Sequence, residues 1–315
     1  MTISLESIEA AAARIRPYIR ETPVEQGYAL GESVWLKCEQ MQRSGSFKIR
    51  GALNSILSLP PDAIARGVVT ASTGNHGRAV ATALTAIGAR GTVYLPHIAP
   101  AMKVQALRRF PGINVEFHGD EGGATELYAR SIAEREGRPY ISPYNDRNVI
   151  AGQGTLGLEF AAQCPSLDAV FVAVGGGGLI SGVATAMKPR TRIVACWPEN
   201  SIAMYESMRA GAIVAPPERP TLSDATAGSV EPGAITLDLC RSLIDDCVLV
   251  SEAEIADAIR FMVAEHQIII EGAAGVAVAA YRKTAARYAG GSVGIVLCGG
   301  NIGYSTLRKI ICETP

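Results

Sequence analysis

A single lysine stands among small residues in residues 44–51 (SGSFKIRG), immediately before a helical pattern. When such an amine is shielded from water near the start of a helix, its pKa falls, and the neutral amine can form a Schiff base with a carbonyl compound. The same sequence also fits an ordinary surface lysine after a Gly-Ser turn. Lys48 is therefore a candidate nucleophile whose role depends on what the fold places beside it.

Two loops of small residues could bind anions. Residues 72–77 (STGNHG) and residues 175–182 (GGGGLISG) each follow an apolar stretch and open a helical pattern. Free N–H groups at a helix start favour a carboxylate or a phosphate, and consecutive glycines let the backbone wrap around it. A capped turn without a ligand is the alternative for the first loop, where His76 is as compatible with capping as with catalysis. A dinucleotide site is the weaker alternative for the second loop, with Glu199 as its ribose-binding acid.

Cys298 ends the last predicted strand, in residues 297–302 (LCGGNI), and could face a bound cofactor. A buried structural cysteine is the alternative interpretation. The chain has seven cysteines, an odd number, and none of them forms a C-x-x-C pair. This pattern argues against both a disulfide framework and a zinc site.

The motifs lie on a chain that alternates strand and helix patterns after an amphipathic opening helix, which we expect Ser4 to cap and Ile8, Ala12 and Ile15 to line on its apolar face. The first series predicts strands over 67–71, 92–95, 114–117 and 139–142, and helices over 75–87, 100–110 and 124–136. The second series predicts strands over 168–174, 192–197, 247–250 and 293–297, and helices over 178–187, 201–210, 252–266 and 271–287. This spacing is typical of βαβ units and predicts an α/β fold with two parallel-sheet lobes. Ligands bind such sheets at the carboxyl ends of the strands, where the motifs fall.

The composition predicts a folded protein that acts on small molecules. Hydrophobic residues make up 48% of the 315 residues and charged residues 19%, which supplies enough apolar surface for a core. The net charge is −1 with no long basic run, so neither nucleic acid nor a membrane surface is an expected partner. Residues 169–187 carry no charge, but four glycines interrupt them, so we expect a strand and a loop rather than a membrane span. Glu6 and Glu9 occupy the place of an export signal, so we expect a cytoplasmic protein.

Taken in order, the four motifs resemble those of the pyridoxal-phosphate-dependent enzymes of fold type II, the tryptophan synthase β-like fold. The nearest branch by motif is that of the serine/threonine dehydratases and serine racemases, and the resemblance extends from the opening helix to Asn301. It implies pyridoxal 5'-phosphate as cofactor, bound in the cleft between two lobes. The large lobe would comprise residues 1–66 and 146–315, and the small, mobile lobe residues 67–145. The resemblance also implies a homodimer.

The resemblance assigns roles to individual residues. Lys48 would hold the cofactor as a Schiff base and then act as the base at the substrate Cα, with Thr73 as a second catalytic residue. Asn75 would hydrogen-bond the ring hydroxyl, and Cys298 would face the pyridine nitrogen. The remaining cofactor contacts would come from Phe47, Gly175, Gly176, Gly177, Gly178 and Leu179. The substrate carboxylate would be bound by Ser72, Thr73, Gly74 and His76.

Cys298 also indicates which reaction to expect. A neutral thiol, unlike an aspartate, does not keep the ring nitrogen protonated, so expulsion of a β-leaving group is favoured over a long-lived carbanion. The expected reaction converts a small β-hydroxy amino acid, L-threonine or L-serine by default, into a 2-oxo acid and ammonia. Because the sequence ends soon after the fourth motif, we expect a catabolic enzyme without a regulatory domain.

Several alternatives stay open at this stage. Dehydratases commonly have Ala where Thr73 stands and racemases have Ser, so an amino-acid racemase is possible. Dehydratases of 3-hydroxyaspartate or of a hydroxyectoine-derived substrate share the core motifs, and specificity would draw on Tyr144, Asn145 and residues 228–233. The cation site of racemases would involve Glu199 and Ala203, but its second carboxylate is replaced here by Tyr205, so we expect no metal. A non-catalytic ligand-binding relative and a nicotinamide oxidoreductase are the remaining alternatives.

Overall fold

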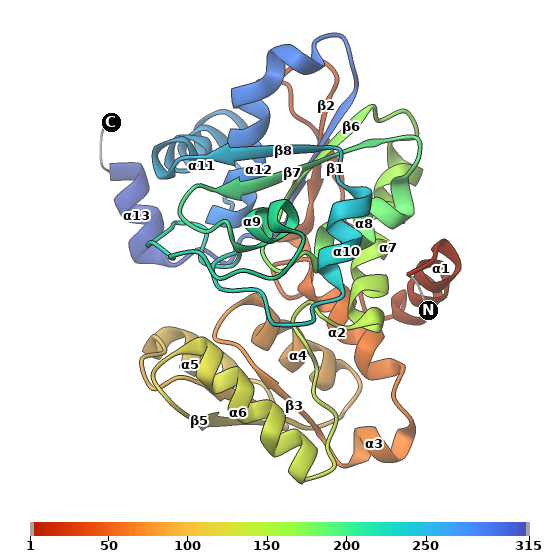
Figure 1. Cartoon of the computed structure of the whole chain (residues 1–315), viewed down its shortest axis with the longest axis vertical. Helices are drawn as coiled ribbons and strands as arrows, with labels where there is room; N and C mark the ends of the chain where they lie inside the picture. The colour runs from red at the N-terminus through yellow and green to blue at the C-terminus, as the bar shows by residue number, and fades with distance from the viewer. Residues whose placement is uncertain (1–2, 313–315) are drawn as a thin grey trace.

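Strands far apart in the sequence assemble into two separate sheets in the computed structural model, which describes residues 3–312 (Figure 1). The larger sheet has the order β1-β2-β9-β6-β7-β8, and the smaller has the order β3-β4-β5. The larger sheet consists of β1 (Val24–Gln26), β2 (Val34–Cys38), β6 (Ala169–Ala173), β7 (Arg192–Pro198), β8 (Asp246–Val250) and β9 (Val293–Leu297). The smaller sheet consists of β3 (Val68–Ala71), β4 (Gly91–Leu95) and β5 (Ile113–Phe117).

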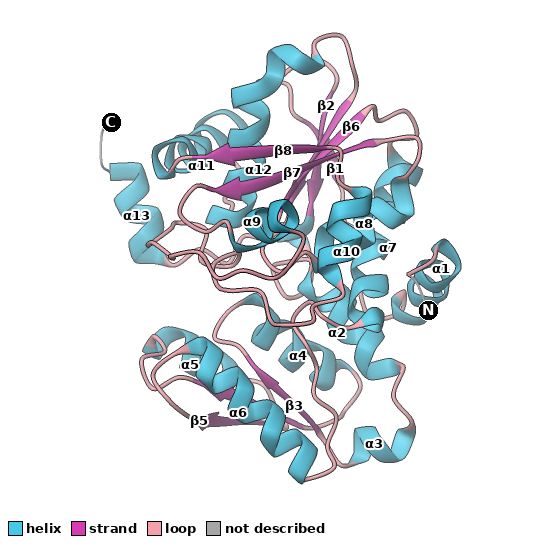
Figure 2. Ribbon diagram, viewed as in Figure 1, coloured by secondary structure: helices cyan, strands magenta, loops and turns pink. Residues whose placement is uncertain are grey.

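The helices connect and cover these sheets, as Figure 2 shows. They are α1 (Leu5–Ile15), α2 (Lys48–Leu57), α3 (Pro61–Ala65), α4 (Asn75–Ala86), α5 (Ala101–Arg108), α6 (Gly122–Arg135), α7 (Arg147–Gln163), α8 (Gly178–Met187), α9 (Ala203–Ala210), α10 (Thr236–Leu243), α11 (Glu252–His266), α12 (Gly272–Thr284) and α13 (Tyr304–Cys312). Two short 3-10 turns, η1 (Glu39–Met41) and η2 (Ala285–Tyr288), complete the set. The predicted α/β fold with parallel sheets is confirmed.

The larger sheet differs from the prediction at one edge. β2 pairs with β9 in parallel, but β1 pairs with β2 antiparallel, so this sheet is mixed. The sequence reasoning did not assign β1 or β2, because Lys37 and Glu25 interrupt their apolar pattern. Lys37 is nonetheless fully buried, because its amine donates to the Glu159 carboxylate at 2.5 Å.

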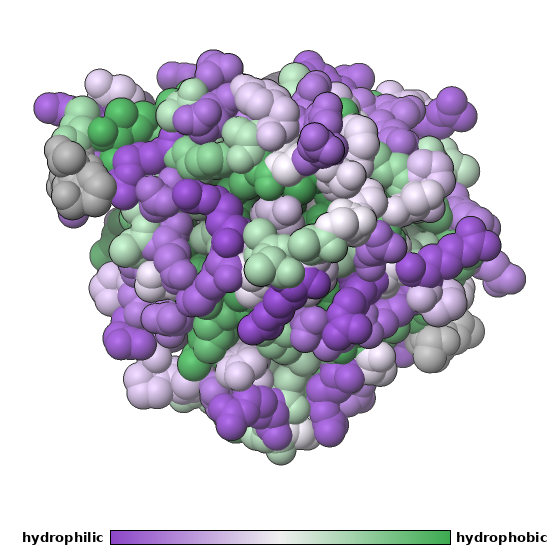
Figure 3. Space-filling view, turned by 90° about the horizontal axis from the view of Figure 1, so that it is seen from above, coloured by the Kyte–Doolittle hydropathy of each residue, from purple (hydrophilic) through white to green (hydrophobic). Residues whose placement is uncertain are grey.

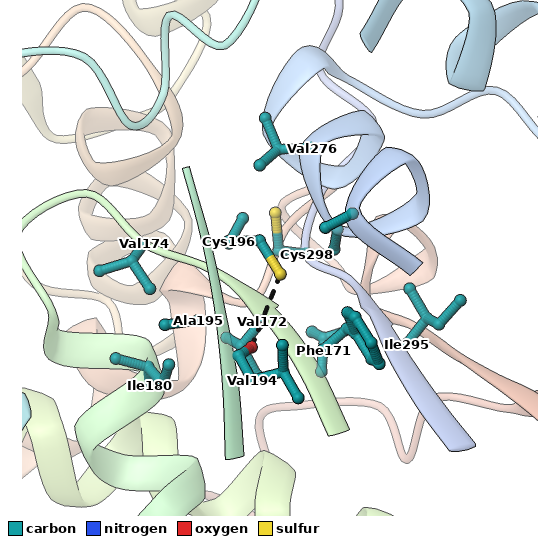
Figure 4. Packing of buried hydrophobic residues seen from close by; sticks show 14 of the residues in the cluster. Phe171, Val172, Val174, Ile180, Val194, Ala195, Cys196, Val276, Ile295 and Cys298 are labelled. Carbon is teal, nitrogen blue, oxygen red and sulfur yellow. Dashed lines mark hydrogen bonds between the residues drawn. The ribbon is translucent and has the colours of Figure 1, made fainter. Parts of the chain in front are cut away.

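The inner strands of the larger sheet are apolar throughout, as expected for strands covered on both faces. β6 and β9 are buried along their whole length, and helices α8 and α12 pack against them. Figure 4 shows the resulting core, in which Phe171, Val172 and Ile295 from the strands meet Ile180 of α8 and Val276 of α12. Cys298 lies in the same cluster, one residue beyond the end of β9.

The strand predicted over residues 139–142 is wrong. Tyr140 forms an isolated bridge to Val69, and this segment makes two backbone hydrogen bonds with the edge of β3 before it turns away. Two features end the pairing. Pro139 has no N–H to donate, and the Ser142 hydroxyl accepts the N–H of Asn145 at 3.1 Å, which closes a turn.

The opening helix α1 is capped as predicted, but the residues it buries differ from the prediction at one position. Ser4 caps α1, and its side chain accepts the N–H of Ser7 at 3.2 Å. Ile8 and Ile15 are buried as predicted, but the third buried residue is Ala11 rather than Ala12. The helix therefore packs through a slightly rotated face.

The surface has the mixed character of a folded globular protein. On the face shown in Figure 3, hydrophilic side chains surround smaller groups of hydrophobic ones. Within residues 3–312, the helices are all too short or too polar to cross a lipid bilayer.

Candidate functional site

The lysine motif (residues 44–51) and the cysteine motif (residues 297–302) lie side by side. Ser46 bridges to Gly299, the N–H of Phe47 donates to the carbonyl of Cys298 at 3.0 Å, and the amide of Asn301 donates to the carbonyl of Ser44 at 3.0 Å. These bonds join the start of α2 to the carboxyl end of β9. A pairing between segments 250 residues apart could not be read from local sequence.

Lys48 is the first residue of α2 and its side chain reaches into a cavity between the two sheets. The cavity has a volume of about 300 Å³. It is lined by residues 72–76, by side chains of α5 and by Asn301 after β9. The Lys48 Nζ donates to the carbonyl of Pro143 at 2.7 Å and lies 5.3 Å from the centre of the Phe47 ring. Burial lowers the pKa of Lys48 to about 8, and the nearby carboxylates of Glu126 and Glu271 oppose the change. A substantial fraction of the amine is therefore neutral near physiological pH, as a nucleophile or base requires.

The STGNHG motif (residues 72–77) forms one wall of the same cavity. Ser72, Thr73 and Gly74 line it, and α4 begins at the next residue. The Gly74 N–H donates to the Ser72 hydroxyl at 3.2 Å, while the remaining N–H groups at this helix start favour an anion. The arrangement fits the predicted carboxylate site at these three residues.

His76 also borders the cavity, but its ring is tied elsewhere. Its Nε2 lies 2.9 Å from the carbonyl of Ile141, and the side chain is buried. Burial and the nearby Lys48 charge lower the pKa of His76 to about 3, so the imidazole is neutral. A neutral ring bonded to a backbone carbonyl anchors this loop to residue 141, and no side chain caps the start of α4. A contact of His76 with the substrate carboxylate stays a prediction.

Glu271 also lines this cavity and a second one beside residues 175–179, although its position in the sequence does not mark it as a candidate site residue. It immediately precedes α12, where it was expected only to begin a helix. Its carboxylate accepts the Asn75 amide at 2.7 Å and the Asn301 N–H at 3.2 Å, so it holds the second and fourth motifs together. Burial raises the pKa of Glu271 to about 7, although the Asn75 hydrogen bond opposes the change. The only signal in the sequence is an acidic residue at a helix start, which occurs in many helices without chemistry.

The glycine motif (residues 175–182) begins with a tightly packed turn at the start of α8, called the glycine turn below. A Cβ at Gly176 would lie 2.5 Å from the Tyr144 ring, and one at Gly175 would lie 3.0 Å from the Thr226 backbone. Gly177 has a φ of +85°, which an L side chain rarely adopts. Together with Gly178 and Leu179, these glycines line a second cavity shared with Phe47, Lys48, Asn75 and Cys298.

Cys298 is buried, 2% exposed, on the wall of this second cavity. Burial and the nearby Glu271 carboxylate raise its pKa well above the ordinary value for a thiol. The side chain is therefore a neutral thiol, as expected for a residue that does not keep a cofactor ring nitrogen protonated.

Of the residues considered for substrate specificity, Tyr144 and residues 228–232 border a third cavity. This cavity has a volume of about 470 Å³ and also reaches Lys48, Ser72 and Thr73. Asn145 instead accepts the N–H of Ile235 at 2.9 Å and so supports the start of α10.

The residues considered for a cation do not form a cluster. The Glu199 N–H donates to the carbonyl of Val250 at 2.8 Å, and the Tyr205 ring packs 5.5 Å from that of Trp197. Across the described residues 3–312, no group of three His, Cys, Asp or Glu side chains could hold a metal ion. The sequence expectation of no metal stays a prediction.

Comparison with known proteins identifies the family. A family model described as pyridoxal-phosphate-dependent enzyme matches residues 15–299. The chain belongs to this family. An L-threonine ammonia-lyase of Thermotoga maritima is 38% identical over 98% of this chain and 78% of its own length. A β-hydroxyaspartate dehydratase of Paracoccus denitrificans is 34% identical over 94% of this chain and 96% of its own length. The structure of maize serine racemase superposes with a TM-score of 0.91 at 33% identity, over 98% of this chain and 97% of that one.

The predicted fold type II architecture is thus confirmed, and pyridoxal phosphate is the cofactor. The residues present fit it. The N–H groups of the glycine turn and of the first turn of α8 suit its phosphate. These groups, Lys48, Asn75 and Cys298 all line one cavity whose glycine wall leaves no room for a side chain.

Proposed function

We propose that the protein eliminates water and ammonia from a small β-hydroxy amino acid and releases a 2-oxo acid. The observation that carries the proposal is the position of Lys48. Its buried amine, with a pKa of about 8, borders both the glycine turn suited to a phosphate and the loop suited to a carboxylate. These are the anionic groups of the cofactor and of an amino acid.

Lys48 has two roles in this proposal. Bound pyridoxal phosphate supplies an electron-withdrawing system joined to the substrate nitrogen, which makes the Cα proton acidic. With the cofactor bound to the substrate nitrogen, the neutral Lys48 amine would be placed to accept that proton. Burial maintains this neutral form, because the charged ammonium loses its hydration inside the protein.

The other residues position and restrict the reaction. Ser72, Thr73 and Gly74 bind the substrate carboxylate and so fix which face of Cα is presented to Lys48. Asn75, held by Glu271, donates or accepts at the cofactor ring. The neutral thiol of Cys298, on the wall of the same cavity, would not keep a pyridine nitrogen protonated, a setting that favours loss of the β-hydroxyl.

A racemase is the second candidate function, and the hydroxyl-bearing Thr73 on the cavity wall favours it. A hydroxyl on the face of Cα opposite Lys48 could return a proton there and yield the other enantiomer. Substitution of Thr73 with Ala separates the two functions, because formation of the D-enantiomer would fall while release of the 2-oxo acid would persist.

The test is release of 2-oxo acid and ammonia from both enantiomers of serine and threonine and from the 3-hydroxyaspartate isomers. We expect equimolar 2-oxo acid and ammonia from L-enantiomers with the wild-type protein, and none with Lys48→Ala. Formation of the opposite enantiomer without ammonia would replace the proposal with racemisation. Cofactor-dependent turnover that persists in Lys48→Ala would overturn the assigned role of Lys48.

We further propose that residues 1–66 and 146–315 form one lobe and residues 67–145 a mobile second lobe. Two hydrophobic clusters around β3, β4 and β5 draw only on residues 67–145 and support this division, whereas a third cluster joins α4 to α2 across the proposed boundary. A homodimer in the cytoplasm is the proposed working form. Light scattering on purified protein tests the dimer, and fractionation of cells tests the location.

A further inference from the structure

Asn301, in the loop after β9, hydrogen-bonds three different parts of the site. Its side-chain nitrogen donates to the Ser44 carbonyl at 3.0 Å and to the Asn75 side-chain oxygen at 2.7 Å, and its side-chain oxygen accepts from Arg78 at 3.2 Å. Asn301 lines the 300 Å³ cavity but not the second cavity, which Asn75 shares with Lys48 and the glycine turn. Asn301 could therefore act on the cofactor only through a neighbour.

The orientation of the Asn301 amide is unambiguous. A backbone carbonyl such as that of Ser44 only accepts hydrogen bonds, and the guanidinium of Arg78 only donates them. If the amide were reversed, its oxygen would face the Ser44 carbonyl and its nitrogen would face the guanidinium, so both hydrogen bonds would be lost. The space around the amide is also filled, because a Cβ at Gly45 would lie 2.5 Å from the Asn301 oxygen.

This orientation fixes that of Asn75. The Asn301 nitrogen donates to the Asn75 oxygen, so the Asn75 nitrogen lies on the other side of its amide, where it donates to Glu271 at 2.7 Å. Glu271 alone does not fix the Asn75 amide, because its pKa is about 7 and its protonated form could donate instead of accept. The Asn301 nitrogen is a donor at any pH, so Asn301 decides which end of the Asn75 amide is which.

One hydrogen on the Asn75 nitrogen stays available for a ligand. An amide nitrogen carries two hydrogens, and Glu271 takes one of them. Asn75 lines the cavity that suits the cofactor. An N–H group on that wall would stabilise a negatively charged oxygen of a bound group, whereas a carbonyl oxygen in its place would repel it.

We infer that Asn301 is a positioning residue for the cofactor ring. By fixing the Asn75 amide, it makes Asn75 a hydrogen-bond donor toward the ring oxygen of bound pyridoxal phosphate. The inference rests on the proposed function, in which Asn75 contacts the ring. A donor at the ring oxygen favours its ionised form, which absorbs light at longer wavelength than the form with a neutral hydroxyl. The absorbance spectrum of the bound cofactor therefore reports the role of Asn301.

The spectrum of the holoenzyme at neutral pH tests the inference without turnover. The ratio of the long-wavelength to the short-wavelength band measures the ionised against the neutral ring oxygen. We expect Asn301→Ala to lower this ratio about tenfold or more, the loss expected for one hydrogen bond to a charged oxygen. Asn200→Ala is the matched control. The Asn200 side chain also donates to a backbone carbonyl, that of Pro220 at 2.7 Å, but it lines none of the three cavities described, so the ratio should not change.

A double-mutant cycle separates an action through Asn75 from a general structural effect. Asn75→Ala should lower the ratio on its own, and the addition of Asn301→Ala should then cause no further change. A further fall in the double variant, or an unchanged ratio in the folded Asn301→Ala holoenzyme, overturns the inference. If Asn301→Ala does not fold, Asn301→Asp takes its place, because it keeps the size and the Arg78 contact but loses both N–H donors. The same fall in the ratio is expected, and an unchanged ratio again overturns the inference.

The outcomes also separate this inference from the proposed function. A lower ratio in Asn75→Ala with an unchanged ratio in Asn301→Ala overturns the role of Asn301 and leaves that of Asn75 standing. An unchanged ratio in both variants overturns the contact of Asn75 with the ring as well. The expected ratios without release of 2-oxo acid from any substrate support the role of Asn301 and overturn the elimination.

Discussion

At the scale of single residues, burial shifts the pKa values of two groups on the wall of the cofactor cavity toward neutral pH. It lowers the pKa of the Lys48 amine and raises that of the Glu271 carboxyl, because a charge loses hydration inside the protein. An amine and an acid with pKa values near neutrality, on the wall of one cavity, are typical of a catalytic site.

The pKa of Lys48 predicts how cofactor attachment depends on pH. Only the neutral amine reacts, so the rate constant for pyridoxal phosphate binding to the apoprotein should rise with pH and level off above about 8. Stopped-flow absorbance at pH values from 6 to 10 measures it. A midpoint near the ordinary lysine value of 10.5 would show that burial does not tune this amine.

Glu271 predicts a pH dependence of stability. The folded protein keeps the proton up to about pH 7, while the unfolded chain releases it near 4.5. The stabilisation from this group is therefore full below pH 4.5 and is lost as pH rises through 7, on the order of 3 kcal/mol in total. Glu271→Gln should remove this component in urea unfolding of the apoprotein. Parallel stability curves for the wild type and the variant would contradict the account.

At the scale of elements, a buried ion network fixes the helix that carries Lys48. Arg50, two residues after Lys48, contacts Glu39 at 2.7 Å and Glu159 of α7 at 2.9 Å, and its side chain is fully buried. Lys37 of β2 contacts the same Glu159 oxygen. The network thus connects α2 to the large sheet and to α7.

Removal of Arg50 should leave the fully buried Glu39 carboxylate without its charged partner, while Glu159 keeps only Lys37. We expect Arg50→Met to lower the free energy of unfolding by about 3–5 kcal/mol, measured by urea denaturation. Arg66→Met is the control, because its pair with Asp62 is exposed and screened by water and should change the stability little. A loss for Arg50→Met no greater than for the control would mean that the network does not stabilise α2.

The glycine turn makes a steric prediction. Gly176→Ala places a Cβ 2.5 Å from the Tyr144 ring, so the turn or the ring must move. We expect at least a tenfold weaker affinity for pyridoxal phosphate, followed by absorbance titration. Gly123→Ala, where a Cβ would meet nothing within 4 Å, should bind as the wild type does. Unchanged affinity in Gly176→Ala would exclude this turn as the phosphate site.

Strands and helices with a simple apolar or capping pattern were predicted accurately, and those whose burial depends on distant residues were not. Continuous apolar strands such as β6 and β9 and capped helices such as α11 were found to within a residue or two. β2 was missed, because its lysine becomes buried only through the ion pair with Glu159, more than 100 residues away. Residues 139–142 were wrongly predicted as a strand, because their apolar pattern resembles one. A proline and a turn closed by a serine limit the segment to one bridge.

At the scale of the whole molecule, the site exists only where the two sheets meet. Lys48, the second motif and the glycine turn were each recognised from local sequence. The link between them depends on Glu271, which bonds Asn75 near the small sheet and Asn301 after β9. The ion pair between Arg130 of α6 and Glu231, at 2.7 Å, likewise forms only across the cleft. Long-range contacts of this kind leave no local pattern, so the candidate reacting groups could be recognised from the sequence but the residues that join them could not.

The most direct test of the account is the identity of the lysine that binds the cofactor. Borohydride reduction of the holoenzyme, followed by proteolysis and mass spectrometry, locates the modified residue. The account predicts a single phosphopyridoxyl group on Lys48. Modification of another lysine in place of Lys48 would contradict the assignment of the site and the mechanism built on it.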